Sequence, residues 1–170
     1  MKTRVGLGYD VHPFAAAADG TPARPLVLGG VTIPDAPGLV AHSDGDAVAH
    51  AVADAVLGAA GLGDLGRAFP ATDASYEGAD SIALLTDVAA RVSHAGWWVG
   101  NVDVVIAAER PRLAPHLDDM AANLRTALQP AAEPMGGGVF VSVKPKRGEG
   151  LGFVGAAEGI AVWACALLER

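Results

Sequence analysis

Apolar side chains recur at the three- and four-residue spacing of a helix in three segments of the chain. The first segment is filled with Ala, Val and Leu, and Ser43 or Asp44 can accept the unpaired N–H groups of its first turn. Gly61 and Gly63 follow it, where helices commonly end. The pattern therefore predicts helices over about residues 44–62, 80–96 and 115–129.

Shorter segments that are rich in β-branched and aromatic residues predict strands. Gly29-Gly30 interrupts one of them, which indicates a bent strand or a hairpin. The last apolar segment fits either a helix or a buried strand, and we predict a strand because it completes a sheet. The predicted strands cover residues 4–9, 26–33, 97–108 with an irregularity at Gly100-Asn101, 139–143 and 159–168, and residues 14–25 are predicted to form a loop.

These elements predict one α+β domain over residues 1–170, because no repeat or low-complexity linker divides the chain. We expect a mixed β-sheet with helices packed on one face. The expected order is strand, helix, strand, strand, helix, strand, which is the ferredoxin-like layout.

Composition excludes several classes of protein. Of the 170 residues 51% are hydrophobic, which excludes intrinsic disorder, and the net charge of −7 argues against nucleic-acid binding. No apolar run reaches the length of a membrane span, and the first residues do not have the pattern of a signal peptide. The single cysteine, Cys165, fits a reducing compartment, so we expect a cytoplasmic protein without membrane partners.

Two polar sites interrupt the apolar pattern. Asp10 and His12 stand two residues apart on a predicted strand, so their side chains share a face and can reach a common metal ion. Asp46, His50 and Asp54 form a stripe at four-residue spacing on an otherwise apolar helix. Both sites also fit a simpler interpretation, in which a strand end and a helix face are exposed to solvent.

Asp10, His12 and His50 together would offer two imidazoles and a carboxylate. Three such ligands suit Zn²⁺ with an open fourth position, which is typical of catalytic zinc. No G-x-S-x-G motif indicates a serine nucleophile, and no glycine-rich nucleotide motif has the required context.

Two features indicate phosphate binding. His42-Ser43 precedes a predicted helix N-terminus, where unpaired N–H groups and the helix dipole favour anions. Residues 110–112 and 144–147 concentrate five of the 12 basic side chains. Solvated loops explain such clusters equally well, so the interpretation stays open on the residues alone.

Several segments of the chain together resemble the 2-C-methyl-D-erythritol 2,4-cyclodiphosphate synthase family, the zinc-dependent cyclases of the non-mevalonate isoprenoid pathway. The resemblance covers nearly the whole chain, and its most specific segments are the D-V-H and H-S-D-G-D motifs. The matching segments are residues 8–12, 41–46 with His50 and Asp54, 63–66, 69–70, 100–103, 111–112, 115–116 and 149–153.

The resemblance implies a homotrimer with active sites between subunits and a nucleotide substrate, 4-diphosphocytidyl-2-C-methyl-D-erythritol 2-phosphate. It implies Zn²⁺ on Asp10, His12 and His50, and Mg²⁺ or Mn²⁺ held between the substrate phosphates with help from Glu149. His42, Asp54 and Glu149 would be catalytic. The implied substrate-binding residues are Asp10, His12, His42, Ser43, Asp54, Asp64, Gly66, Phe69, Asp73, Ala108, Arg112, Leu113, Ala114, Lys146, Arg147, Glu149 and Phe153.

The chain departs from the family pattern at four positions that bear on substrate binding. Lys146 and Arg147 replace two threonines of the cytidine-phosphate loop, Ala71 replaces an aspartate, and Ala156 replaces an arginine. Two alternatives to the cyclase therefore remain. One is a divergent zinc protein that binds a nucleotide without cyclising it, and the other is a non-catalytic trimer that binds isoprenoid diphosphates.

Overall fold

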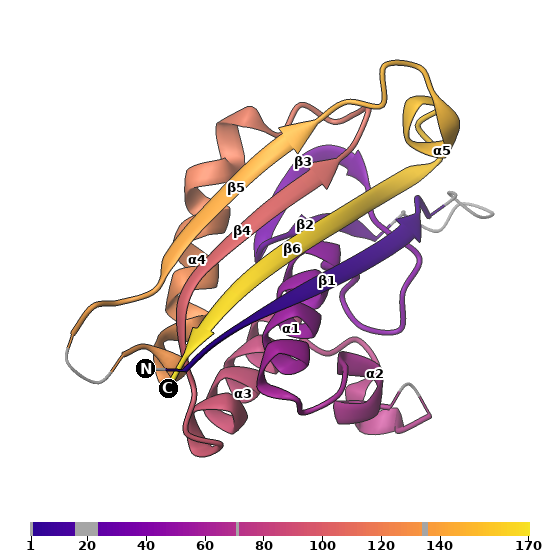
Figure 1. Cartoon of the computed structure of the whole chain (residues 1–170). Coiled ribbons are helices and arrows are strands. Elements are labelled where there is room, and N and C mark those ends of the chain that lie inside the picture. Colours follow the sequence, from indigo (N-terminus) through magenta and orange to yellow (C-terminus); the bar gives the residue numbers. More distant parts are fainter. Residues whose placement is uncertain (1, 16–23, 71, 134–135) are drawn as a thin grey trace.

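A computed structural model describes residues 2–15, 24–70, 72–133 and 136–170. The strands and helices succeed one another as Figure 1 shows. The strands are β1 (Thr3–Pro13), β2 (Pro25–Leu28), β3 (Val31–Pro37), β4 (Trp98–Ala107), β5 (Phe140–Lys146) and β6 (Gly159–Glu169). The helices are α1 (Ala47–Ala60), α2 (Leu65–Ala68), α3 (Ser81–His94), α4 (Leu117–Leu128) and α5 (Gly152–Gly155), with 3₁₀ turns at Ala74–Tyr76, Ala114–His116 and Gln129–Ala131.

The predicted elements are confirmed, with changes at their ends. Residues 26–33 form a hairpin that turns at Gly29-Gly30, where both glycines have positive φ, and the irregularity in β4 is a register shift between Val99 and Asn101. The ambiguous last segment is strand β6. Most of the loop predicted for residues 14–25 lies outside the described residues.

The main sheet has four strands in the order β1-β6-β4-β5. β6 is antiparallel to both of its neighbours, whereas β4 and β5 are parallel and are connected through α4. Along the chain the order is strand, two long helices, strand, helix, strand, strand, because the β2–β3 hairpin forms a separate sheet. The α+β class is confirmed, but this order differs from the predicted ferredoxin-like layout.

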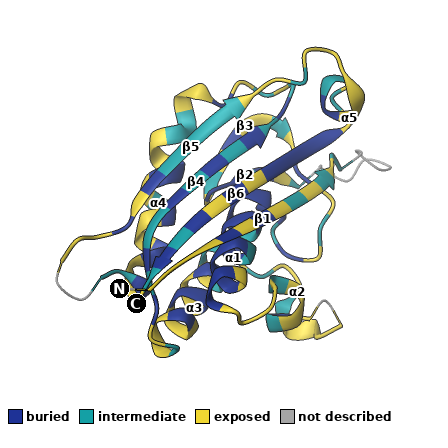
Figure 2. Ribbon diagram, in the orientation of Figure 1, coloured by how far each residue is buried: buried dark blue, intermediate teal, exposed yellow. Residues whose placement is uncertain are grey.

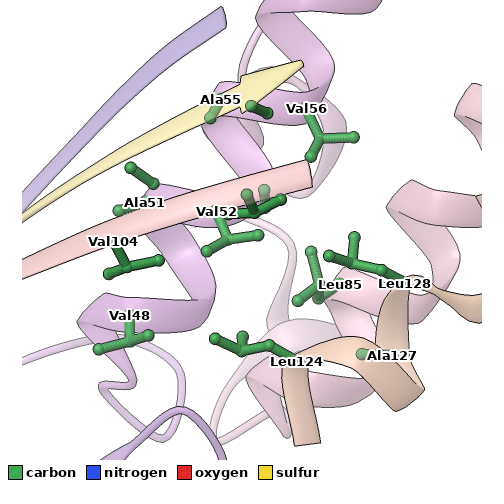
Figure 3. Packing of buried hydrophobic residues seen from close by; sticks show 14 of the residues in the cluster. Val48, Ala51, Val52, Ala55, Val56, Leu85, Val104, Leu124, Ala127 and Leu128 are labelled. Carbon is green, nitrogen blue, oxygen red and sulfur yellow. The ribbon is translucent and has the colours of Figure 1, made fainter. Parts of the chain in front are cut away.

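Helices α1, α3 and α4 cover one face of the sheet, and the core lies between the two layers (Figures 1 and 3). Helix α1 is buried on nearly all sides, as its Ala- and Val-rich sequence requires. None of the described helices is long and apolar enough to cross a membrane.

Two glycines of β1 let α1 lie directly against that strand. A Cβ atom on Gly6 would come within 1.9 Å of the Ala55 carbonyl oxygen, and one on Gly8 within 1.9 Å of the Ala51 carbonyl oxygen. Any larger residue would push the helix away. This close approach sets the distance between the end of β1 and the first turns of α1.

The opposite face of the sheet is not covered by any helix of the described residues, and parts of its strands are exposed (Figure 2). Several of these exposed residues are large and apolar. Leu7 is 72% exposed and Phe140 is 68% exposed. Exposed apolar patches of this kind commonly mark an interface. The other exposed apolar residues of these strands are Val5, Tyr9, Val11 and Trp163.

Candidate functional site

The end of β1 and the first turn of α1 bring three ligand-type side chains together. Nε2 of His12 lies 3.0 Å from Oδ2 of Asp10, and Nδ1 of His50 lies 3.1 Å from the same oxygen. The three donor atoms lie within 4.8 Å of one another, so they could hold one metal ion. The predicted set is thus confirmed as a cluster.

The outer nitrogen of each imidazole has its own partner. Nδ1 of His12 lies 2.7 Å from the Val40 carbonyl oxygen and can donate to it, which leaves the lone pair of Nε2 directed at the cluster. Nε2 of His50 contacts the hydroxyls of Ser43 and Ser81 at 3.0 Å and 2.9 Å. With both imidazoles held in this way, two nitrogen ligands and one oxygen ligand could bind a metal ion and leave a coordination position open.

The charges of the cluster favour metal binding. Burial acts to raise the pKa of Asp10, but the hydrogen-bonded imidazoles of His12 and His50 outweigh it and lower this pKa to about 2. The hydrogen bond to Asp10 raises the pKa of His12 above its ordinary value, although burial opposes the shift. Asp10 is therefore ionised at neutral pH and can serve as a ligand.

A pocket of about 300 Å³ opens beside the cluster. His42 and Ser43, predicted to contact a phosphate, both line it, as do Gly66 and Phe69. The pocket therefore joins residues from β1, α1 and the segments around α2. Its remaining lining residues are His12, Ala41, His50, Leu65, Tyr76 and Leu84.

Asp54 lies one helical turn beyond His50 on α1, and its carboxylate accepts a 2.7 Å hydrogen bond from the Leu65 N–H. Burial raises the pKa of Asp54, and the Leu65 N–H opposes the shift. Asp64 caps the N-terminus of α2 and accepts a hydrogen bond from the Arg67 N–H. Both carboxylates thus help to place the segment that carries Gly66 into the pocket.

The N-terminus of α1 is capped by a side chain, so the free N–H groups predicted to favour an anion beside His42-Ser43 are not available there. The helix begins at Ala47, and its cap is the buried carboxylate of Asp46, which accepts the N–H groups of Val48 and Ala49. The same carboxylate accepts the N–H groups of the hairpin turn, Gly29 and Gly30. Because Asp46 is fully buried, the polar stripe of α1 is not a solvated face.

A second pocket, of about 430 Å³, contains the residues predicted to border a cytidine. Arg147 pairs with Glu109 there, and Glu109 also accepts the Gly148 N–H. Lys144 does not line this pocket and pairs with Asp103, so the second basic run is not one site. The predicted residues that line this pocket are Ala108, Arg112, Leu113, Ala114, Lys146 and Arg147.

The two pockets lie at the same end of the main sheet but on different strands. The pairing of the strands places four residues side by side across the sheet, namely Lys146 of β5, Ala107 of β4, Ala161 of β6 and Val11 of β1. Three strand spacings, or about 14 Å, therefore separate β5 from β1 at this level of the sheet. The metal cluster is at the β1 edge, and the second pocket is at the β5 edge.

Six predicted site residues line neither pocket of this chain. Asp10, Asp54 and Asp64 lie close to the metal cluster or to α2, and the other three are exposed elsewhere. Asp73 is exposed and its carboxylate accepts the N–H and O–H of Ser75, which lower its pKa. Glu149 and Phe153 are exposed on the segment around α5. Ala71 lies outside the described residues, and Ala156 ends α5.

Sequence reasoning missed several residues that the fold brings to the site. Ser81 reads as an ordinary helix start after Asp80, and Glu109 precedes the basic loop without any motif of its own. Only tertiary packing places Ser81 against His50 and Glu109 against Arg147. Asp44 belongs to the H-S-D-G-D motif, which is the one local signal that could have drawn attention to it.

Comparison with known proteins agrees with this geometry. The model of the YgbB family matches residues 3–169. A 2-C-methyl-D-erythritol 2,4-cyclodiphosphate synthase of Bordetella petrii is 50% identical over 98% of this chain and 96% of its own length. A bifunctional enzyme IspD/IspF of Anaeromyxobacter dehalogenans is 52% identical over 97% of this chain, which spans 39% of that enzyme.

A solved structure has the same fold. It is the CDP complex of IspF from Plasmodium falciparum, and the match covers 98% of this chain and 95% of the other, with 30% identity and a TM-score of 0.77. The family model and the full-length relative each extend over nearly all of the sequence. The chain therefore belongs to the YgbB family.

Proposed function

We propose that this chain converts 4-diphosphocytidyl-2-C-methyl-D-erythritol 2-phosphate into 2-C-methyl-D-erythritol 2,4-cyclodiphosphate and CMP. The 2-phosphate oxygen attacks the β-phosphorus, and the bond from that phosphorus to the CMP oxygen breaks. One observation carries the proposal, namely the cluster of Asp10, His12 and His50 beside a pocket lined by His42 and Ser43. The full-length relatives bear the name of this synthase.

We assign Asp10, His12 and His50 as ligands of Zn²⁺, with one ion per chain. When bound, zinc acts as a Lewis acid on the β-phosphate, and Mg²⁺ or Mn²⁺ held with help from Glu149 offsets charge on both phosphates. A chain of net charge −7 lacks a general surplus of positive side chains, so local cations suit this reaction.

The remaining residues bind and orient the substrate. His42 and Ser43 contact the methylerythritol phosphate, and Asp54 accepts hydrogen bonds from the erythritol hydroxyls. The 2-phosphate is already an anionic nucleophile, so no side chain has to remove a proton to generate it. Catalysis by these residues consists of positioning the two phosphates in line.

We propose further that the chain forms a homotrimer whose active sites lie between subunits. Two observations support this proposal: the uncovered apolar face of the main sheet, and the distance between the two pockets within one chain. In such an assembly the second pocket of one subunit would bind the cytidine beside the metal cluster of its neighbour. The Plasmodium falciparum structure is a complex with CDP, which agrees with a nucleotide ligand.

Zinc affinity is expected to fall as the pH falls through the pKa of His12, because a protonated imidazole cannot ligate. Asp10 raises this pKa above 6.5 in the metal-free chain, so protons compete with the metal at higher pH than for an ordinary histidine. Asp10 itself stays ionised down to about pH 2. Competition titrations between about pH 5.5 and 8.5 should show a loss of up to about tenfold per pH unit. A flat profile would contradict the ligand role of His12.

The ion pair of Asp10 and His12 also affects the stability of the metal-free fold. His12, whose folded pKa is raised, contributes stability below about pH 6.5, and this contribution is lost as the pH rises through the raised pKa. Zinc affinity and metal-free stability therefore change in opposite directions over this range, which thermal unfolding with and without zinc can separate.

Lys146 and Arg147 are expected to differ in their effect on substrate binding. The guanidinium of Arg147 is paired with Glu109, whereas Lys146 makes no ion pair within the described residues. Lys146→Thr should raise KM about threefold to tenfold, as expected for loss of an exposed charge-assisted hydrogen bond. Arg147→Thr should change KM less. Equal KM values for Lys146→Thr and the native chain would contradict phosphate binding by Lys146.

A second candidate function is a zinc protein that binds the nucleotide without cyclising it, because Lys146 and Arg147 depart from the family pattern at the nucleotide site. Measurement of turnover distinguishes the two candidates. The test is incubation of the purified chain with the substrate, Zn²⁺ and Mg²⁺, followed by measurement of CMP and of the cyclic product. We expect a cytoplasmic location, on the basis of the single cysteine.

A further inference from the structure

Ser81, the first residue of α3, lies behind the metal cluster and not in the substrate pocket. Its side chain is buried, with 1% exposed, and it does not line the pocket that contains Ser43. The Ser81 hydroxyl lies 2.9 Å from Nε2 of His50 and 2.5 Å from Oδ1 of Asp44. It therefore connects a carboxylate to the outer nitrogen of a proposed metal ligand.

The direction of these hydrogen bonds follows from the groups involved. An ionised carboxylate only accepts, so Asp44 takes the hydrogen bond of the Ser81 hydroxyl. The Ser81 oxygen is then left with its lone pairs, and it accepts a hydrogen bond from Nε2–H of His50. With the proton on Nε2, the lone pair of Nδ1 faces Oδ2 of Asp10, where the metal would bind.

We infer that Asp44 and Ser81 are positioning residues that fix the ring orientation and the tautomer of His50. This inference rests on the metal site of the proposed function. Neither residue belongs to the ligand cluster or lines the pocket beside it. Their role is to hold His50 in the one arrangement in which it can ligate without a further change of proton position.

Further contacts hold Asp44 in place. Its Oδ2 accepts the Ser81 N–H at 3.0 Å and its Oδ1 accepts the Asp46 N–H at 3.1 Å, while its own N–H donates to the Ala79 carbonyl. These hydrogen bonds connect the loop before α1 to the start of α3. His50 is thus oriented from a second helix as well as from its own.

The same arrangement leaves the Ser43 hydroxyl available for the substrate. Its oxygen accepts the Gly45 N–H at 3.3 Å and lies 3.0 Å from Nε2 of His50. Because Nε2 of His50 carries the proton that it donates to Ser81, it cannot accept one from Ser43, so the Ser43 proton can point into the pocket toward a phosphate oxygen. Ser81 and Ser43 both contact His50, but only Ser43 lines the pocket.

The test is the zinc affinity of Ser81→Ala, measured by competition with a chromophoric chelator and without any substrate. Loss of such a partner of a metal-bound histidine weakens metal binding by about 10- to 100-fold, and we expect a loss in this range. Ser81→Thr keeps the hydroxyl and should recover most of the affinity. Asp44→Asn, which keeps the shape but not the charge, should weaken zinc binding in the same direction and serves if Ser81→Ala does not fold.

Asp80→Ala is the matched control, because Asp80 caps α3 through the N–H groups of Ile82 and Ala83 without contacting His50. It should lower the melting temperature and leave the zinc affinity unchanged. Native affinity in both Ser81→Ala and Asp44→Asn, while His50→Ala loses zinc, would overturn this inference alone. A native chain that binds no zinc would overturn the metal site, and this inference with it.

Discussion

Replacement of His50 by alanine is expected to abolish zinc binding and turnover together. His50 provides one of only two nitrogen donors in the cluster, and its Nδ1 lies 3.1 Å from the shared oxygen of Asp10. The metal supplies several kcal/mol of transition-state stabilisation in such reactions, so kcat should fall on the order of 10³-fold or more. Elemental analysis of the purified variant and initial-rate assays measure the two effects.

His94→Ala is the matched control for this variant. His94 is an exposed histidine in the last turn of α3, and it belongs to neither the cluster nor the pocket beside it. It should retain one zinc per chain and native turnover. Stoichiometric zinc in His50→Ala would show that the metal lies elsewhere.

Replacement of Leu7 by aspartate is expected to convert a trimer into monomers. Leu7 is 72% exposed on the uncovered face of the sheet, so the folded chain itself tolerates a charge there. In a trimer that buries this face, three carboxylates would lose water without partners, which costs several kcal/mol for each group. Light scattering after size-exclusion chromatography gives the mass, and turnover should be lost with the shared sites.

An acidic residue on the helical side of the molecule controls for the added charge. Ala83→Asp places a carboxylate in the first turn of α3, where Ala83 is exposed and the helix dipole favours it. This variant should keep the mass and the activity of the native protein. A Leu7→Asp protein that keeps the native trimer mass would contradict the assignment of the sheet face as the interface.

Local sequence patterns were sufficient to predict most of the elements of this fold. The long helices and the strands have clear periodicity, and even the ambiguous segment 159–168 is a strand as predicted, one of the two inner strands of the sheet. The order of strands in space was not predictable in the same way. It depends on the pairing of β6 with both β1 and β4 and on the parallel pairing of β4 and β5, which are long-range contacts that no local pattern records.

The metal cluster was predictable because two-residue spacing on a strand fixes Asp10 and His12 on one face, and because His50 interrupts an apolar helix. The residue that caps α1 was not predictable. Ser43 and Asp44 are equally good caps by residue type, and only the packing of the hairpin turn against Asp46 selects that residue. For the same reason Ser81 could not be recognised as a partner of His50, since their contact joins residues 31 positions apart.

The most direct test of the proposed function is phosphorus NMR of the native chain during incubation with 4-diphosphocytidyl-2-C-methyl-D-erythritol 2-phosphate, Zn²⁺ and Mg²⁺. We expect CMP and the cyclic diphosphate to appear in equal amounts, and both signals to be absent with His50→Ala. Release of CMP with the uncyclised 2,4-bisphosphate, or persistence of the substrate with a zinc-loaded trimer, would contradict the assignment of this chain as a cyclase.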